Sequence, residues 1–142
     1  MSIIKYKLDG ERLHIPEGFL EGFNRENLRI VEDSVELRRR GLFRYVDLGR
    51  LGYKKLKFLR LTDRPPLGGG MKEQLVASKV HHVIPKKKGK LYRITLPELL
   101  RNYAGIEKNC VMVKVEGGKP YIGIWGENEW KKYTKLAKNC PV

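Results

Sequence analysis

The expected fold rests on one stretch of sequence, Lys86-Lys87-Lys88-Gly89-Lys90-Leu91-Tyr92-Arg93-Ile94-Thr95-Leu96-Pro97-Glu98-Leu99-Leu100-Arg101. It begins as a basic turn on Gly89, with five cations and no acids between Lys86 and Arg93. An alternating strand follows, and Pro97 then opens a helix, because its missing N–H costs nothing in a first helical turn. This order predicts the contact loop of a nucleic-acid-binding β-domain.

The basic charge of the chain is clustered. The net charge is +14 over 142 residues, with a pI near 9.9. Residues 36–60 hold nine Arg or Lys against two acids, a surplus of seven, and residues 86–93 add a surplus of five. Clustering favours a face for a polyanion, which is DNA, RNA or an anionic membrane, over a generally basic solvated surface. Of the three, nucleic acid is favoured.

Composition limits the other function classes. The 41% hydrophobic content is enough for a packed core, and no apolar run approaches a membrane span. Residues 1–7 alternate instead of forming an apolar signal segment, so a soluble, cytoplasmic protein without a membrane partner is expected. Cys110 lies in an apolar run and is expected in the core, and the chain has no Cys-x-x-Cys. We expect no metal and no cofactor.

The first half alternates strands and turns. Residues 2–8 predict a strand, Asp9-Gly10 a hairpin turn, residues 12–15 a second strand and Pro16 the start of a short helix. On the second strand, Leu13 and Ile15 share one face while Arg12 and His14 share the other.

The middle of the chain is harder to assign. A strand over residues 28–31 is expected to turn at Glu32-Asp33-Ser34 and pair with residues 35–42. Residues 53–61 fit a strand or a basic amphipathic helix, and the period does not decide. Pro-Pro and three glycines in residues 62–70 mark a break. It divides the chain into halves 1–67, with a basic insertion at about 36–61, and 71–142.

The second half repeats this order. Arg12-Leu13-His14-Ile15-Pro16-Glu17 aligns with Arg93-Ile94-Thr95-Leu96-Pro97-Glu98 at a constant offset of 81. A half of this size cannot bury a core alone, so the two are expected to pack about a pseudo-two-fold axis. The remaining second-half elements expected are strands at 80–85, 110–115 and 121–125, a helix over 97–103 ended by Gly105, and a last helix from Glu127 or Asn128.

The second half resembles a known family. The matching features are an Arg-apolar-x-apolar-Pro strand, an Ala-Gly-Ile-x-Lys helix end, a valine-rich strand, and an Ile-Trp strand end followed by a helix with Trp and Tyr. The residues are Arg93, Leu96, Pro97, Leu100, Arg101, 104–108, 111–113, Ile124, Trp125, Trp130 and Tyr133. This pattern is similar to the second half of MraZ, in the SpoVT/AbrB swapped-hairpin superfamily.

The resemblance implies a mainly β (α+β) fold in which two AbrB-like halves form an interlocked β-barrel with short helices. It also implies DNA binding and assembly into a homo-oligomer such as a ring. It gives the turn the contact role and residues 97–101 a positioning role. The family's halves carry Asp-x-x-x-Arg before the strand, whereas Gly89 precedes Arg93 by four residues here and Asp9 precedes Arg12 by three.

Candidate contacts are the cations that can reach phosphates, with arginine also able to read guanine. They are Lys86, Lys87, Lys88, Lys90 and Arg93 in the second half, Arg12 and Lys7 in the first, and Arg38, Arg39 and Arg40 in the basic insertion. The charges of the insertion have alternative explanations without a ligand: a solvated hairpin, or an edge strand that they protect from pairing with other chains. Trp125, Trp130 and Tyr133 are expected to pack in the core.

Three functions fit these observations. The leading hypothesis is a sequence-specific, nucleoid-associated DNA-binding transcriptional regulator, and the second is an RNA-binding or ribosome-associated β-barrel protein. The third is a nuclease, for which Asp33, Glu36 and Arg38 give only a faint motif with the wrong spacing. No catalytic set stands out, so no enzyme activity is expected.

Overall fold

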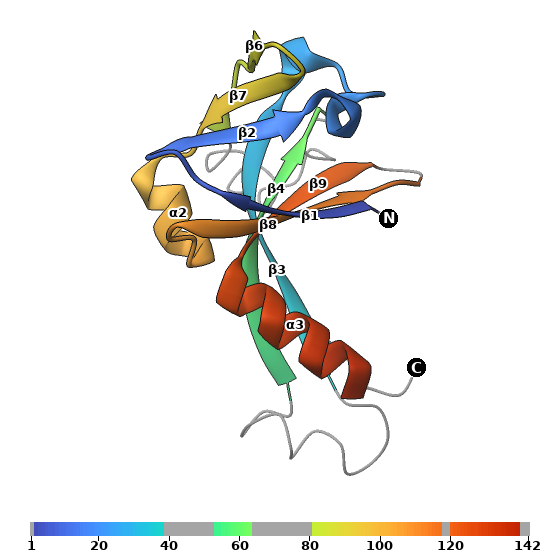
Figure 1. Cartoon of the computed structure of the whole chain (residues 1–142). Coiled ribbons are helices and arrows are strands. Elements are labelled where there is room, and N and C mark those ends of the chain that lie inside the picture. The colour runs from blue at the N-terminus through green and yellow to red at the C-terminus, as the bar shows by residue number, and fades with distance from the viewer. Residues whose placement is uncertain (1, 39–52, 64–80, 118–119, 140–142) are drawn as a thin grey trace, which may run out of the picture.

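The computed structural model describes residues 2–38, 53–63, 81–117 and 120–139 (Figure 1). Its strands are β1 (Ser2–Lys7), β2 (Arg12–Pro16), β3 (Arg29–Arg38), β4 (Tyr53–Thr62), β5 (His81–His82), β6 (Lys86–Lys88), β7 (Leu91–Thr95), β8 (Asn109–Val115) and β9 (Tyr121–Gly126). Its helices are the 3-10 turns η1 (Glu17–Leu20) and η2 (Arg25–Asn27) and the α-helices α2 (Glu98–Ala104) and α3 (Glu127–Asn139). The predicted contacts Arg39 and Arg40 lie outside the described residues.

The strands form two antiparallel sheets. One has six strands in the order β1-β8-β9-β4-β3-β5, and the other has three in the order β2-β7-β6. Figure 1 shows the small sheet across one end of the molecule, with β3 and β4 running from beneath it to the opposite end. The predicted mainly β fold with short helices is confirmed. The described pairings do not close into a barrel, so the interlocked barrel stays a prediction.

The connectivity repeats between the parts of the chain before and after the undescribed segment 64–80. In the six-stranded sheet, β1, β3 and β4 of the first part correspond to β5, β8 and β9 of the second. Exchanging the members of each pair gives the same strand order, read from the opposite edge. In the small sheet, Leu13 pairs with Ile94, its equivalent at the offset of 81. An approximate two-fold axis through that pair relates β2 to β7. Four pairings join the two parts: β1 with β8, β2 with β7, β3 with β5 and β4 with β9.

The predicted turn at Glu32-Asp33-Ser34 is wrong. β3 continues through these residues to Arg38, and all ten of its residues pair with β4, from Arg29 opposite Thr62 to Arg38 opposite Tyr53. Polar residues locally favour a turn, but a full ladder of backbone hydrogen bonds with a distant partner outweighs that preference. The same pairing decides the open question at residues 53–61 in favour of a strand.

The main core lies between the two sheets. The small sheet contributes Leu13, Ile15, Tyr92 and Ile94, and the large sheet contributes residues such as Ile30, Leu61 and Met112. Phe19 and Leu20 of η1 close one side, and Leu100 and Ala104 of α2 pack into the same cluster. Cys110 is buried here as predicted, and burial raises its thiol pKa to about 12, which keeps it protonated and unreactive.

A second cluster occupies the other face of the large sheet. The Trp125 ring stacks on Phe58 with centroids 4.5 Å apart, and Trp130 and Tyr133 of α3 cover Trp125 at 5.5 and 5.1 Å. The predicted packing role of these aromatics is confirmed. The last helix begins at Glu127, the first of the two expected starting residues. None of the described helices is long and apolar enough to cross a membrane.

Candidate nucleic-acid interface

The lysine turn is a tight hairpin between β6 and β7. Lys88 pairs with Leu91, which leaves Gly89 and Lys90 as the two-residue loop. Gly89 has φ of 63° and no described non-glycine residue has positive φ, so the loop fits a type II′ turn. Lys90 therefore lies at the exposed tip of the hairpin.

Register brings the basic side chains of three strands onto one face. Residues directly opposite each other in an antiparallel pair share a face. Arg93 lies opposite Lys86 on one side and His14 on the other, and Arg12 lies opposite Thr95. Since Leu13, Ile15, Tyr92 and Ile94 point into the core, these residues point outward. We call this surface the outer face; it comprises Arg12, His14, Pro16, Lys86, Lys88, Leu91, Arg93 and Thr95.

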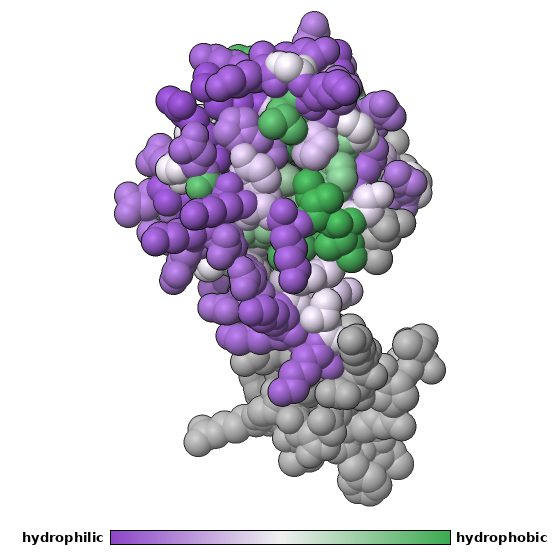
Figure 2. All heavy atoms as spheres, viewed as in Figure 1, coloured by the Kyte–Doolittle hydropathy of each residue, from purple (hydrophilic) through white to green (hydrophobic). Residues whose placement is uncertain are grey.

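The outer face is accessible and largely hydrophilic. Lys86, Lys88, Arg12 and Thr95 are exposed, and Arg93 and His14 are half-buried. In Figure 2, hydrophilic side chains cover the end of the molecule where β6 and β7 lie. None of the cations on this face is in an ion pair among the described residues, so they can receive an anionic ligand.

Lys87 is separated from its neighbours. It pairs with Tyr92, whose ring lies on the core side, and its Nζ lies 6.0 Å from the centre of that ring and 3.8 Å from a Glu17 carboxylate oxygen. Arg25 of η2 also approaches Tyr92, at 5.1 Å. Lys87 thus belongs to a different side of the hairpin from Lys86 and Lys88.

The first half has a similar turn with different charges. Asp9 and Arg12 exchange two backbone hydrogen bonds of 3.1 and 2.9 Å around Gly10 and Glu11, and Gly10 has the same φ of 63° as Gly89. The predicted hairpin turn is thus present, with Gly10 and Glu11 as its loop. Beyond Asp9 and Arg12 the strands separate into the two sheets, because β1 pairs with β8 and β2 with β7. Asp9, Gly10, Glu11, Arg12 and Thr95 line an open hollow of about 480 Å³.

Each half anchors the turn of the other half. Arg101 of α2 donates from Nε to the Leu96 carbonyl at 3.0 Å and from NH2 to Glu11 at 3.3 Å. Reciprocally, the Glu17 backbone N–H in η1 donates to the Lys90 carbonyl at 3.0 Å. The positioning role expected of residues 97–101 therefore applies, for Arg101, to the turn at Gly10 and not to the lysine turn.

Other predicted contacts lie elsewhere. Lys7 is exposed on β1 in the large sheet, on the strand face opposite to the half-buried Tyr6. Arg38 ends β3, nine residues beyond Arg29 and so about 30 Å further along the strand. This end of β3, where it pairs with the start of β4, lies away from the small sheet (Figure 1). The basic insertion thus does not join the outer face through its described residues.

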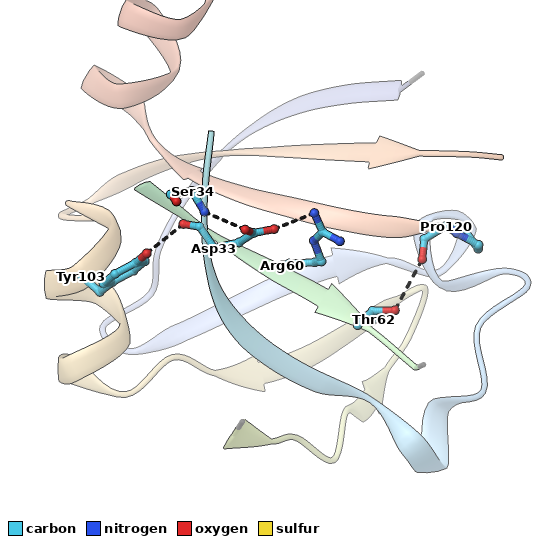
Figure 3. A network of polar contacts seen from close by, with 6 residues as sticks. All are labelled: Asp33, Ser34, Arg60, Thr62, Tyr103 and Pro120. Atoms are coloured by element: carbon cyan, nitrogen blue, oxygen red, sulfur yellow. Dashed lines mark hydrogen bonds and ion pairs between the residues drawn. The ribbon is translucent and has the colours of Figure 1, made fainter. Parts of the chain in front are cut away.

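Asp33 of the faint nuclease motif holds structural contacts. Asp33 binds Arg60 at 2.6 Å, and its second oxygen accepts from the Ser34 N–H at 2.7 Å (Figure 3). Tyr103 of α2 donates to the Asp33 carbonyl at 3.0 Å, and burial together with Glu32 and Asp33 raises the pKa of Tyr103. Among the described residues, no group of three or more His, Cys, Asp or Glu side chains could hold a metal.

Sequence reasoning missed three residues near this surface. His14 and Thr95 lie on the outer face. The alternation of side chains along residues 12–15, which puts His14 on the same face as Arg12, could have identified His14 from the sequence. Lys114 is buried, and its Nζ donates to the Gly18 and Glu21 carbonyls at 2.9 and 3.3 Å, which fixes η1 on the large sheet. Nothing in the local sequence marks that contact, because its partners are about 95 residues away.

Comparison with known proteins agrees with the second half. A family model described as "MraZ protein, putative antitoxin-like" matches residues 89–141. Residues 89–141 are MraZ-like. This segment includes Arg93 and Arg101 but not β6 or the first half.

Three of the curated proteins that match part of this chain are each named "Transcriptional regulator MraZ". The protein of Symbiobacterium thermophilum is 47% identical over 45 residues, covering 32% of this chain and 30% of that protein. The protein of Cutibacterium acnes is 28% identical over 68 residues, covering 48% and 44%. That of Frankia casuarinae is 38% identical over 52 residues, covering 37% and 32%. The matches thus span less than half of each relative. No solved structure matches the chain.

Proposed function

We propose that this chain is a DNA-binding transcriptional regulator that contacts duplex DNA through the outer face and the lysine turn. The observation that carries the proposal is the register of β2, β7 and β6, which gathers Arg12, Arg93, Lys86 and Lys88 on one exposed surface. The MraZ-like segment supports the regulatory role, since the matched relatives are named transcriptional regulators.

The chemistry of the outer face suits a duplex. Lysines at the hairpin can neutralise phosphates, while Arg12 and Arg93 can also donate in pairs to guanine in the major groove. Sequence preference would come from the two arginines, and most of the affinity from the lysines.

Titration of a fluorescent duplex against the full chain tests this proposal. The logarithm of the association constant should fall linearly with the logarithm of the salt concentration. The slope should be about −0.9 for each phosphate that the protein neutralises. A structured RNA of equal length is the competitor. If the chain binds the RNA as tightly as the duplex or more tightly, the DNA-binding proposal is refuted in favour of an RNA-binding protein.

The wider architecture is part of the same proposal. We propose that residues 1–67 and 71–142 are two AbrB-like halves interlocked through their shared sheets, and that copies assemble into a homo-oligomer, with a ring as its closed form. Oligomers would multiply weak contacts along DNA. A monomeric mass by multi-angle light scattering at micromolar concentration would refute the assembly without touching DNA binding.

We propose no catalytic role and a cytoplasmic, nucleoid-associated location. Asp33 is committed to Arg60, which argues against a metal-dependent cut at that residue. Incubation of supercoiled DNA with the protein and Mg²⁺ or Mn²⁺ is the check. Cleavage that disappears in Asp33→Ala or Glu36→Ala would establish a nuclease instead.

A further inference from the structure

We infer that His14 binds a phosphate oxygen of the nucleic acid through Nε2–H, and that Tyr6 is a positioning residue that holds the imidazole in the required tautomer. This inference rests on the proposed function, and it adds a neutral donor to a face otherwise described by its cations.

His14 lies on β2, an edge strand of the small sheet, next to the central strand β7. It is directly opposite Arg93 on β7, two residues from Arg12 on its own strand, and on the far side of Arg93 from Lys86. Arg12 in turn lies opposite Thr95, which is the equivalent of His14 at the repeat offset of 81. Each arginine therefore has a hydrogen-bonding side chain directly opposite it in the β2–β7 pair.

The Tyr6 hydroxyl is hydrogen-bonded to His14 Nδ1, and the two rings are tilted with centroids 5.8 Å apart. A neutral imidazole has one N–H and one acceptor nitrogen. A phenol O–H is a better donor than an imidazole N–H, and an imidazole nitrogen is a better acceptor than a phenol oxygen, so Tyr6 donates and Nδ1 accepts. The proton of the ring is then on Nε2. Burial, Asp9 and Cys110 raise the pKa of Tyr6, which keeps its hydroxyl protonated as a donor.

Nε2 remains open to a ligand. Nε2 lies across the ring from Nδ1 and has no hydrogen-bond partner among the described residues. The buried side-chain atoms without a partner are Arg29 Nε and Arg60 Nε. His14 Nε2 is not among them, so it is accessible to solvent. A solvent-accessible N–H opposite Arg93 and two residues from Arg12 lies in a region of positive charge. The anionic oxygens of a phosphate are the ligand atoms drawn to that charge.

The decisive variants exchange the donor and keep the shape. His14→Gln places an amide N–H near the position of Nε2, whereas His14→Leu has similar bulk and no donor. We expect His14→Leu to weaken binding of a 20-base-pair duplex about 10-fold and His14→Gln to stay within about 3-fold of the unaltered chain, as for one hydrogen bond to a charged group. His82→Ala, exposed on β5 outside the outer face, is the matched control and should bind normally.

Two measurements distinguish a failure of the proposed function from a failure of this inference. If the unaltered chain does not bind the duplex, the proposed function is refuted. If His14→Leu binds as well as the unaltered chain, only this inference is refuted. A loss confined to one DNA sequence would assign His14 to a base and overturn the phosphate contact. Long-range ¹H–¹⁵N correlation without DNA should show a protonated Nε2 and a hydrogen-bonded acceptor Nδ1 in the unaltered chain, and the Nδ1 resonance should shift in Tyr6→Phe, which removes the hydrogen bond. A dominant Nδ1–H form would overturn the role of Tyr6.

Discussion

The turn at Gly10 and the turn at Gly89 share a glycine φ of 63° and a two-residue loop, but their neighbouring side chains carry opposite charge. In both turns the glycine is the first residue of the loop. The first is bordered by Asp9 and Glu11, and Glu11 is neutralised by Arg101, while the second is bordered by lysines. The glycine sets the local geometry, and the side chains around it set what the turn can bind.

The comparison also explains the irregular repeat. The two turns are 79 residues apart, whereas Arg12 and Arg93 are 81 apart. The second strand is thus two residues longer between its turn and its arginine. Because side chains alternate with a period of two, this extension returns Arg93 to the same face as Arg12. A shift of one residue would have placed it in the core.

The largest predicted effect concerns the charge difference between the turns. Replacing Lys86, Lys88 and Lys90 by alanine should reduce the slope of log affinity against log salt by about 2.7, or about 500-fold in affinity at 0.1 M salt, if each lysine neutralises one phosphate. Fluorescence anisotropy over a salt series measures both quantities.

The matched control removes three exposed lysines from α3, with Lys131, Lys132 and Lys135 replaced by alanine. It makes the same change in net charge far from the hairpin. An equal loss in both triple variants would mean that total charge, and not the lysine turn, determines affinity.

An intermediate effect is expected from the shared backbone. Gly10→Ala and Gly89→Ala should each lower the free energy of unfolding by about 1–2 kcal/mol, because an L-residue is strained at positive φ. An added Cβ would meet nothing within 4 Å at either site, so strain is the only cost. Urea denaturation monitored by Trp125 and Trp130 fluorescence measures it.

Gly18→Ala is the control for those two variants. This glycine has no positive φ and an added Cβ there also meets nothing within 4 Å, so its stability should change little or rise slightly. Unequal losses at Gly10 and Gly89 would show that the two turns are not the same structure.

The smallest effect is expected from the ion pair that anchors the first turn. Arg101→Lys loses the bond from Nε to the Leu96 carbonyl and should cost about 1 kcal/mol in the free energy of unfolding. Glu11→Gln should cost under about 0.5 kcal/mol, because the Glu11 side chain is 60% exposed and such pairs are screened. A double-mutant cycle isolates the pair, and a coupling above about 1 kcal/mol would contradict this ranking.

Much of the second half was predictable, because its local signals agree with its packing. Pro97 and Gly105 bound α2 as expected, and Gly105 takes the left-handed conformation with φ of 67° that ends the helix. The strands around residues 110–115 and 121–125 are present within a residue of their predicted limits. In the first half, polar residues at 32–34 predicted a turn that the pairing of β3 with β4 replaces.

The sequence by itself determined the basic stretch, the glycine turns, the strand periodicity and the repeat of Arg12 and Arg93, since each depends on residues a few positions apart. The tertiary structure alone decided which strands are neighbours. It thereby placed Lys86 and Lys88 on the same face as Arg93 and Lys87 near Glu17. It also placed His14 opposite Arg93 and in a hydrogen bond with Tyr6. These contacts join residues from different strands, and strand register is fixed only when both sheets close on their common core.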